Sequence, residues 1–178
     1  ILKKNILEFK ENFEKSNSDA TILLCEVDNP TQFGIADIEG NTIKKIVEKP
    51  KNPPSNFAVI GIYFLSPKIF DIIKKLKPSW RNELEISSIH NAYLEDGSLR
   101  VEELNRGVTW IDAGTVDSLL MASNFISNIE KMQTYKISCP EEISFNNGWI
   151  SEDELSKLAQ EQIKSGYGEY LKRILEGL

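Results

Sequence analysis

A run of nine uncharged residues, FAVIGIYFL at positions 57–65, constrains the fold more than any other feature of this chain. Aliphatic and aromatic residues dominate it, and it is far shorter than the roughly 18 residues that cross a bilayer, which predicts a buried β-strand. Directly before it, the segment VEKPKNPPSN places Glu48 and Lys49 at the end of another apolar segment and then adds three prolines. We therefore expect a stiff loop that holds a charged pair at the mouth of a buried strand.

Strand-like and helix-like patterns alternate through the first 135 residues. The run Thr21–Val27 is short, β-branched and nearly uncharged, which is typical of a strand covered on both faces. Residues 33–49 predict a hairpin that turns at Gly40-Asn41, and short strands are expected at Leu99–Leu104 and Val108–Ile111. This alternation predicts an α/β fold with a mixed sheet.

Helices are predicted where apolar residues recur at intervals of three and four. The first covers Leu2 to Phe13, a second begins at Ser66-Pro67, and a third runs from about Leu84 to Gly97. Thr115 is expected to cap a long fourth helix. The positions expected to face inward are Ile69, Phe70, Ile73 and Leu76 in the second helix, and Leu119, Ala122, Ile126 and Ile129 in the fourth.

The last part of the chain has a different pattern. The segment CPEEISFNNGW at 139–149 reads as irregular, Ser151 and Glu154 have the spacing of a capping box, and Ser165-Gly166 separates two helices. On the final helix, a stripe of apolar residues suits either oligomer contacts or an intramolecular core. That stripe consists of Tyr167, Tyr170, Ile174 and Leu178. We therefore predict a core domain at 1–135 and a helical C-terminal appendage at 136–178.

Charge and composition argue against several classes of protein. The net charge of −6 and the pI near 5.0 argue against non-specific binding of nucleic acid or anionic membranes. No segment is long enough to span a bilayer and no signal peptide is visible, which favours a cytoplasmic protein. Cys25 and Cys139 are expected to be free thiols, and His90 is expected to be structural or exposed. Because the chain opens without methionine inside a helical pattern, we expect a fragment of a longer protein.

Charged residues occupy three positions beside predicted strands or turns, where α/β proteins collect their ligands. Taken alone, each has a plain structural explanation, either as a solvent-exposed residue at the end of a strand or as a residue that stabilises the start of a helix. These positions are Glu48-Lys49, Arg81 and Asp112. Together they indicate phosphate chemistry, because Arg and Lys suit an anionic ligand and a single carboxylate suits Mg²⁺. Trp110 could cover a sugar or base, or be a half-buried core residue. No Ser/His/Asp arrangement competes with this interpretation.

Five ordered segments carry a resemblance to a known family. The segments are EKPKNPPSNFAVIGIYF, LKPSWRNELEI, NRGVTWIDAGTVDSLLMASNF, CPEEISFNNGWI and YGEYLKRIL. In their order, these segments resemble the C-terminal part of the glucose-1-phosphate thymidylyltransferases, which are sugar nucleotidyltransferases. The resemblance implies a Rossmann-like nucleotidyltransferase core and a reaction that makes dTDP-glucose and pyrophosphate from dTTP and glucose 1-phosphate. It also implies a place in dTDP-rhamnose and polysaccharide synthesis, a Mg²⁺ cofactor and a homotetramer.

The resemblance assigns roles to individual residues. It implies that Glu48 and Lys49 bind the sugar and its phosphate, that Arg81 helps to hold that phosphate, and that Asp112 coordinates Mg²⁺. The implied mechanism is in-line attack by the sugar-phosphate oxygen on the α-phosphorus of dTTP, with no covalent enzyme intermediate. The residues implied to lie against the sugar are Gly34, Val59 and Tyr63.

Departures from the family pattern leave alternatives open. The family's glycine-rich G-x-G-T-R-L loop and its second Mg²⁺-binding aspartate do not occur in these 178 residues, so we expect the chain alone to be inactive. Where the family has R-G-E-L-E-I-T-D, this chain has RNELEISS at 81–88, and where the family has D-T-G it has DAG at 112–114. These differences bear on the identity of the sugar substrate more than on the reaction class. The alternatives are a non-catalytic binding or assembly module, and a nucleotidyltransferase with another sugar or base.

Overall fold

The chain folds into two compact units that divide between Trp110 and Ile111. The computed structural model describes residues 6–40, 42–79, 81–104 and 107–177, and each unit is described by itself. Leu2, Asn41 and Leu178, which the sequence patterns included, lie outside the described residues. The domain boundary expected after residue 135 stays a prediction.

A five-stranded mixed sheet forms the first unit, with the strand order β3-β2-β4-β1-β5. Only β1 and β5 run parallel, and every other neighbouring pair is antiparallel. This arrangement confirms the mixed α/β prediction, the hairpin at 33–49 and the strand at 99–104. The strands are β1 (Ala20–Glu26), β2 (Gly34–Glu39), β3 (Thr42–Glu48), β4 (Phe57–Leu65) and β5 (Leu99–Glu103).

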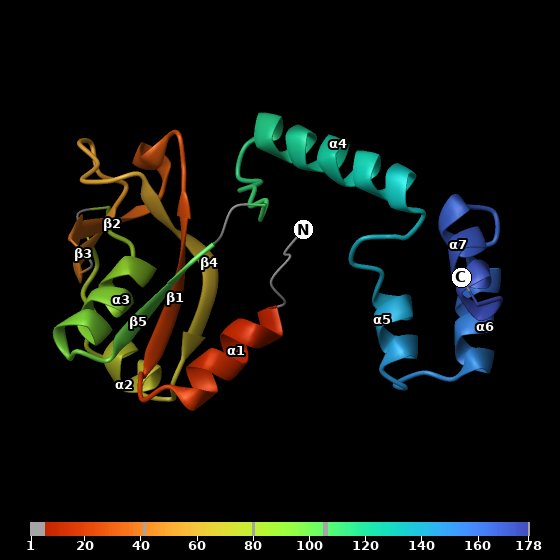
Figure 1. Ribbon diagram of the computed structural model, residues 1–178, viewed down its shortest axis with the longest axis horizontal. Coiled ribbons are helices and arrows are strands. Elements are labelled where there is room, and N and C mark those ends of the chain that lie inside the picture. The colour runs from red at the N-terminus through yellow and green to blue at the C-terminus, as the bar shows by residue number, and fades with distance from the viewer. Residues whose placement is uncertain (1–5, 41, 80, 105–106, 178) are drawn as a thin grey trace. The chain divides into compact units, whose positions relative to one another are not determined.

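Helices cover both faces of this sheet (Figure 1). On one face, Phe9 of α1 packs with Leu23 and Ile60, and α3 lies on the other face. The helical elements of this unit are α1 (Ile6–Lys15), the 3₁₀ turn η1 (Pro30–Gln32), α2 (Ile69–Ile73) and α3 (Ile86–Glu95). In the described parts of the chain, no helix is both long and apolar enough to cross a membrane.

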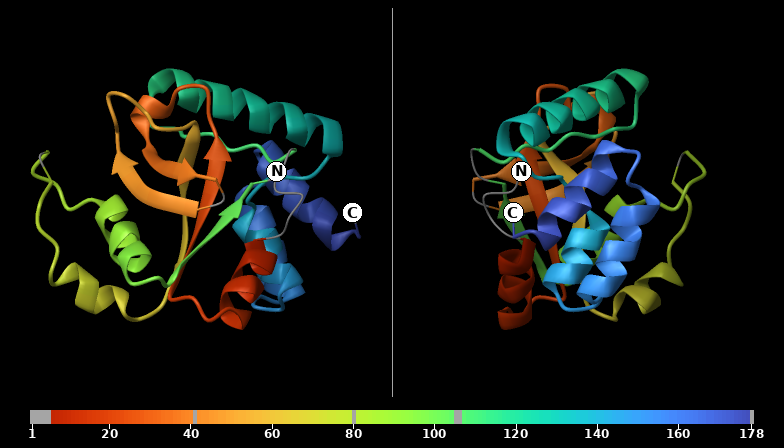
Figure 2. Two further views of the ribbon diagram at one scale, coloured as in Figure 1. Left: turned by 60° about the vertical axis from the view of Figure 1, so that its left-hand side comes forward. Right: turned by 90° about the vertical axis from the view of Figure 1, so that its right-hand side faces the viewer.

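Strand β4 has the predicted bounds but is less buried than its sequence indicates. Only Ala58 and Ile60 are buried, and the remaining residues are partly or fully exposed. Its pairing with β1 shifts register between Ile22 and Leu24, and such irregularities increase the local twist and bend of a strand. The β2–β3 hairpin, orange in Figure 2, pairs with β4 at Ile35 and Ala58. Val59 and Tyr63 of β4 pack against the sheet core and also line a pocket.

Helix α2 differs from its prediction in both its start and its buried face. The chain first makes a turn at Ser66-Pro67, and the helix begins at Ile69 with Lys68 at its N-cap. Two of the positions predicted to face inward are on the exposed side, with Phe70 66% exposed and Ile73 also exposed. The residues that pack against the core are Ile69, Ile72 and Leu76.

The predicted strand at Val108–Ile111 was wrong. These residues are described, and they form neither strand nor helix. A strand needs a neighbour to satisfy its backbone hydrogen bonds, and no ladder partner is present in the described ranges. The sequence pattern therefore identified apolar residues that pack by their side chains, as Trp110 does in the cluster around Phe9.

The second unit begins with helix α4 (Val116–Gln133), which has the predicted cap at Thr115. The Ser118 N–H donates to Thr115 Oγ1 and the Thr115 N–H donates to Ser118 Oγ, both at 3.1 Å, so the capping box is complete. Of the four predicted inward positions, Leu119 and Ile126 are exposed, so the prediction was wrong for them, whereas Ala122 and Ile129 are half-buried. No residue of α4 is buried, and Leu119 is 55% exposed.

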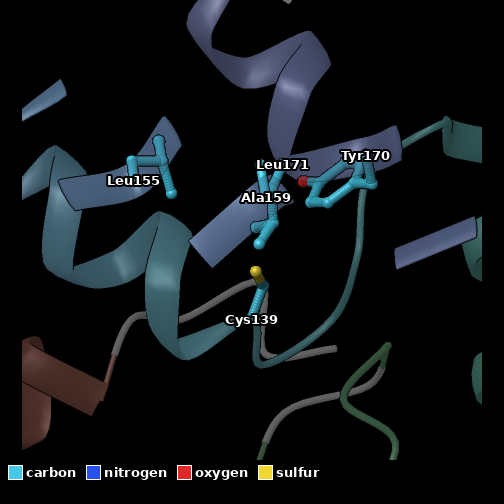
Figure 3. Packing of buried hydrophobic residues seen from close by; sticks show 5 residues of the cluster. All are labelled: Cys139, Leu155, Ala159, Tyr170 and Leu171. Atoms are coloured by element: carbon cyan, nitrogen blue, oxygen red, sulfur yellow. The ribbon is translucent and has the colours of Figure 1, made fainter. Parts of the chain in front are cut away.

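Three helices pack together in the rest of the second unit (Figure 3). The helices are α5 (Pro140–Asn146), α6 (Glu152–Glu161) and α7 (Gly166–Leu175). The predicted Ser151–Glu154 capping box is confirmed, whereas the prediction of an irregular 139–149 segment was wrong. A proline at the first helical position followed by two glutamates was the signal for α5 that the pattern analysis missed. Their shared core consists of Cys139, Leu155, Ala159, Tyr170 and Leu171.

The tyrosine stripe of α7 contributes to this intramolecular core. Tyr170 is buried, and Tyr167 and Ile174 pack against the same cluster. Both tyrosine hydroxyls donate to the two glutamates of the first turn of α5, Tyr170 to Glu142 at 2.5 Å and Tyr167 to Glu141. Of the two readings of the stripe, the structure therefore supports packing within the chain.

Asn91 joins helix α3 to the open edge of strand β3. Its Nδ2 donates to the Ile46 carbonyl oxygen and its Oδ1 accepts from the Ile46 N–H, both at 2.8 Å. The side-chain amide thus bonds to the edge strand as a neighbouring strand would, and it places the adjacent His90 and Ser87 over the sheet.

We expect Asn91→Ala to lower the free energy of unfolding by about 2 kcal/mol, because two hydrogen bonds to an edge strand are lost. Urea denaturation of the chain measures this change. Asn91→Asp keeps the acceptor and loses the donor, so it should fall between wild type and alanine. An alanine variant as stable as wild type would contradict this role.

Candidate functional site

A pocket of about 160 Å³ lies in the first unit, where β2 begins and β3 ends beneath α3. Four of the residues assigned by resemblance line this one pocket, although they come from three different strands. They are Gly34, Glu48, Val59 and Tyr63. The fold therefore brings together the predicted sugar-contacting group and the glutamate of the charged pair.

Gly34 and Glu48 face one another across the β2–β3 ladder. A Cβ atom built on Gly34 would lie 3.3 Å from Glu48 Oε2 and 3.7 Å from the Ile46 side chain. Any larger residue at position 34 would therefore press on the carboxylate. A glycine here leaves room for both the Glu48 side chain and the pocket.

Arg81 lies beside the pocket without lining it. Its guanidinium is within ion-pair distance of three carboxylates, with its nitrogens 2.8 Å from Glu83 Oε2, 3.5 Å from Glu85 Oε1 and 3.9 Å from Glu48 Oε1. Glu85 is nearly buried and also accepts from the Ser79 hydroxyl at 2.7 Å. Arg81 is thus held in orientation by acidic residues, and an anionic ligand would share or replace these contacts.

Asn82 explains one departure from the family pattern. It stands where the family motif has glycine, and its φ is +61°. This left-handed region favours glycine, and asparagine is among the few other residues that enter it readily. The turn that presents Arg81 can therefore form without the glycine.

Lys49 directly follows strand β3 and has an unusual backbone conformation. Its φ is +41°, it precedes Pro50, and its N–H donates to the Phe33 carbonyl oxygen at 3.0 Å. Left-handed backbone in a lysine is uncommon, and persists where surrounding structure imposes it. In the part of the chain that the structure describes, the Lys49 ammonium forms no ion pair, so it is available to a ligand next to Glu48.

Trp110 and Asp112 lie on opposite sides of the division between the two units. Trp110 packs edge-on against Phe33, with ring centroids 5.1 Å apart, and Phe33 lines the pocket. Asp112 belongs to the second unit and is exposed. A Cβ on Gly114 would lie 3.2 Å from Asp112 Oδ2, so this glycine too leaves room for a carboxylate.

The described residues could bind Mg²⁺ only together with ligands from a bound substrate. Within the described residues, no group of three His, Cys, Asp or Glu side chains could hold a metal. Asp112 offers two hard oxygen atoms, and Mg²⁺ commonly takes one or two carboxylates and completes its shell with phosphate oxygens and water. The residues therefore fit an ion that arrives with a phosphorylated ligand.

Helix α3 contributes pocket residues that the sequence reasoning missed. Ile86, Ser87 and His90 line the pocket from one face of the helix. Burial lowers the pKa of His90 from 6.5 to about 4, so the imidazole is neutral at pH 7. Burial and the nearby Glu48 carboxylate raise the pKa of Tyr63. The three- and four-residue spacing of these α3 positions was the available signal.

A family model for nucleotidyl transferases matches residues 1–129 of the chain. The chain belongs to the nucleotidyl transferase family. Its curated relatives include the glucose-1-phosphate thymidylyltransferase of Neisseria meningitidis serogroup A, 44% identical over 158 residues, which are 88% of this chain and 55% of the relative. The enzyme of the same name from Mycolicibacterium smegmatis is 44% identical over 161 residues, 89% of this chain and 56% of the relative. This nucleotidyl transferase chain thus spans about half the length of these relatives.

Solved structures support the same family fold. A Bacillus anthracis protein, solved with sucrose and described provisionally as a glucose-1-phosphate thymidylyltransferase, is 44% identical with a TM-score of 0.63, covering 70% of this chain and 50% of its own. A UDP-glucose pyrophosphorylase solved with UDP-glucose is 26% identical with a TM-score of 0.60, covering 72% and 52%. The expected nucleotidyltransferase fold is confirmed by these neighbours.

Proposed function

We propose that the protein transfers a thymidylyl group from dTTP to glucose 1-phosphate, and that residues 1–178 supply the sugar-phosphate side of the site. The observation that carries this proposal is the gathering of Gly34, Glu48, Val59 and Tyr63 around one pocket. Arg81 reaches Glu48 at the edge of that pocket, and Lys49 follows Glu48 directly.

The chemistry of the pocket supports a compact neutral ligand with hydroxyl groups. Its volume of about 160 Å³ is below the roughly 300–1,000 Å³ of clefts that hold drug-sized ligands. Glu48 and Tyr63 offer polar groups to hydroxyls, while Val59 and Ile46 offer apolar contact to the faces of a ring. A sugar ring suits this mixture, and its phosphate would lie outside, towards Lys49 and Arg81.

The two cations would hold the attacking phosphate in place. An oxygen of that phosphate attacks the α-phosphorus of dTTP, the bond to the β-phosphate oxygen breaks, and pyrophosphate leaves. Lys49 would contribute a point charge and Arg81 a planar fork already oriented by Glu83 and Glu85. Asp112 would hold a Mg²⁺ ion, which neutralises charge on the triphosphate when bound.

The same proposal includes the wider setting implied by resemblance. The product dTDP-glucose would enter dTDP-rhamnose and polysaccharide synthesis in the cytoplasm, and the protein would act as a homotetramer. Residues 1–178 contain no glycine-rich G-x-G-T-R-L loop. We therefore propose that these residues alone bind glucose 1-phosphate but do not turn it over.

The test is release of pyrophosphate by the whole natural reading frame, with Mg²⁺ and a matrix of dTTP or UTP against several sugar 1-phosphates. We expect the fastest release with dTTP and glucose 1-phosphate. A different preferred pair would replace the proposed substrate and keep the reaction class. No release with any pair would favour the non-catalytic binding module, and turnover by residues 1–178 alone would contradict their proposed role.

A further inference from the structure

His90 is the only histidine of the chain, and its side chain is 0% exposed. It lies on α3 and lines the pocket described above. Neither Nδ1 nor Nε2 has a hydrogen-bond partner among the described residues. The imidazole therefore has one donor and one acceptor that the described residues leave unsatisfied beside a cavity.

An unpaired imidazole in this position needs a physical explanation. The large majority of buried polar side-chain atoms in proteins are hydrogen-bonded, and an unpaired buried group destabilises the fold. A leucine or phenylalanine would fill the same space between α3 and the sheet without this penalty. A group that enters the pocket and can both donate and accept would complete the hydrogen bonds of His90.

The surroundings of His90 define the kind of group that can do so. The Tyr63 ring packs against the imidazole with centroids 4.7 Å apart and planes at 58°, and Glu48 lines the same pocket. Because burial keeps the imidazole neutral, it cannot compensate the charge of an anion. A neutral hydroxyl, which both donates and accepts, matches a neutral imidazole.

We propose that His90 determines specificity for the sugar by hydrogen-bonding one of its ring hydroxyl groups. This inference rests on the proposed binding of glucose 1-phosphate in the pocket. It places the phosphate at Lys49 and Arg81 and a ring hydroxyl at His90, so that inorganic phosphate would not reach the imidazole.

Because His90 is the lone histidine, its ring ¹⁵N resonances can be followed without ambiguity in a ¹⁵N-labelled chain. We expect them to shift when glucose 1-phosphate is added to saturation and to stay unchanged with inorganic phosphate. If the sugar phosphate binds to saturation and these resonances do not change, the role of His90 is overturned while the proposed binding of glucose 1-phosphate stands. Absence of any glucose 1-phosphate binding would overturn the proposed function together with this inference.

Substitution provides a second test, with calorimetric binding and thermal unfolding measured on each variant. His90→Leu should lower affinity for glucose 1-phosphate about 3- to 10-fold, as expected for one neutral hydrogen bond, while leaving the unfolding midpoint equal or higher. His90→Gln should recover part of the affinity. Ile89→Val, on the same helix but outside the pocket lining, should lower the midpoint and leave affinity unchanged. Unchanged affinity in His90→Leu would overturn the inference.

Discussion

Replacing Lys49 by glycine is expected to give a protein that folds more stably than its alanine counterpart and binds glucose 1-phosphate just as weakly. Lys49 has a φ of +41° directly before Pro50. A residue with a Cβ atom is strained in this region, whereas glycine is not. We expect the free energy of unfolding of Lys49→Gly to exceed that of Lys49→Ala by about 1 kcal/mol, after allowing for the greater freedom of glycine in the unfolded chain.

Both variants lose the ammonium group, so the expected loss of affinity is the same for each. A charge-assisted hydrogen bond contributes roughly 1.5–3 kcal/mol, which corresponds to a roughly 10- to 100-fold weaker Kd. Calorimetry with glucose 1-phosphate and urea denaturation measure the two effects on the same samples. Lys51→Ala, which removes an exposed lysine two residues away, is the matched control and should change neither quantity. Wild-type affinity in either Lys49 variant would disprove its contact with phosphate.

Acidification is expected to destabilise the fold well before the carboxylates titrate. The pKa of His90 is about 4 in the folded chain, below its ordinary value of 6.5. Between these values the unfolded state binds a proton that the folded state does not, so stability falls as pH decreases. The loss amounts to about 3 kcal/mol between pH 6.5 and pH 4, with full stability above that range.

Denaturant titrations at several pH values measure this loss, and His90→Leu isolates its source. The variant should show a much flatter profile between pH 6.5 and about 5. Three carboxyl groups also have pKa values below their ordinary values, which are 3.8 for aspartate and 4.5 for glutamate. Their contribution to stability is lost as the pH falls below those ordinary values, which is a lower pH range than that of His90. Those groups are Asp96, Glu130 and Glu154. Equal slopes in wild type and His90→Leu would show that another group is responsible.

Features determined by short-range chemistry were predictable from the sequence by itself. The hairpin at 33–49, the bounds of β4, the helix cap at Thr115 and the capping box at Ser151 depend on residues only a few positions apart. Turn formation, strand alternation and helix capping are local effects, so their signals remain visible in a linear sequence. The charged pair Glu48-Lys49 at the end of a strand was found for the same reason.

Only the tertiary structure decided which surfaces meet. It left Leu119 and Ile126 of α4 exposed and gave Val108–Ile111 no strand partner among the described residues. It also surrounded Arg81 with three carboxylates and placed His90, without a partner in the described chain, beside a pocket formed by distant strands. Burial, ion pairing and pKa values depend on groups far apart in the sequence, and periodicity shows which residues are apolar without showing what packs against them.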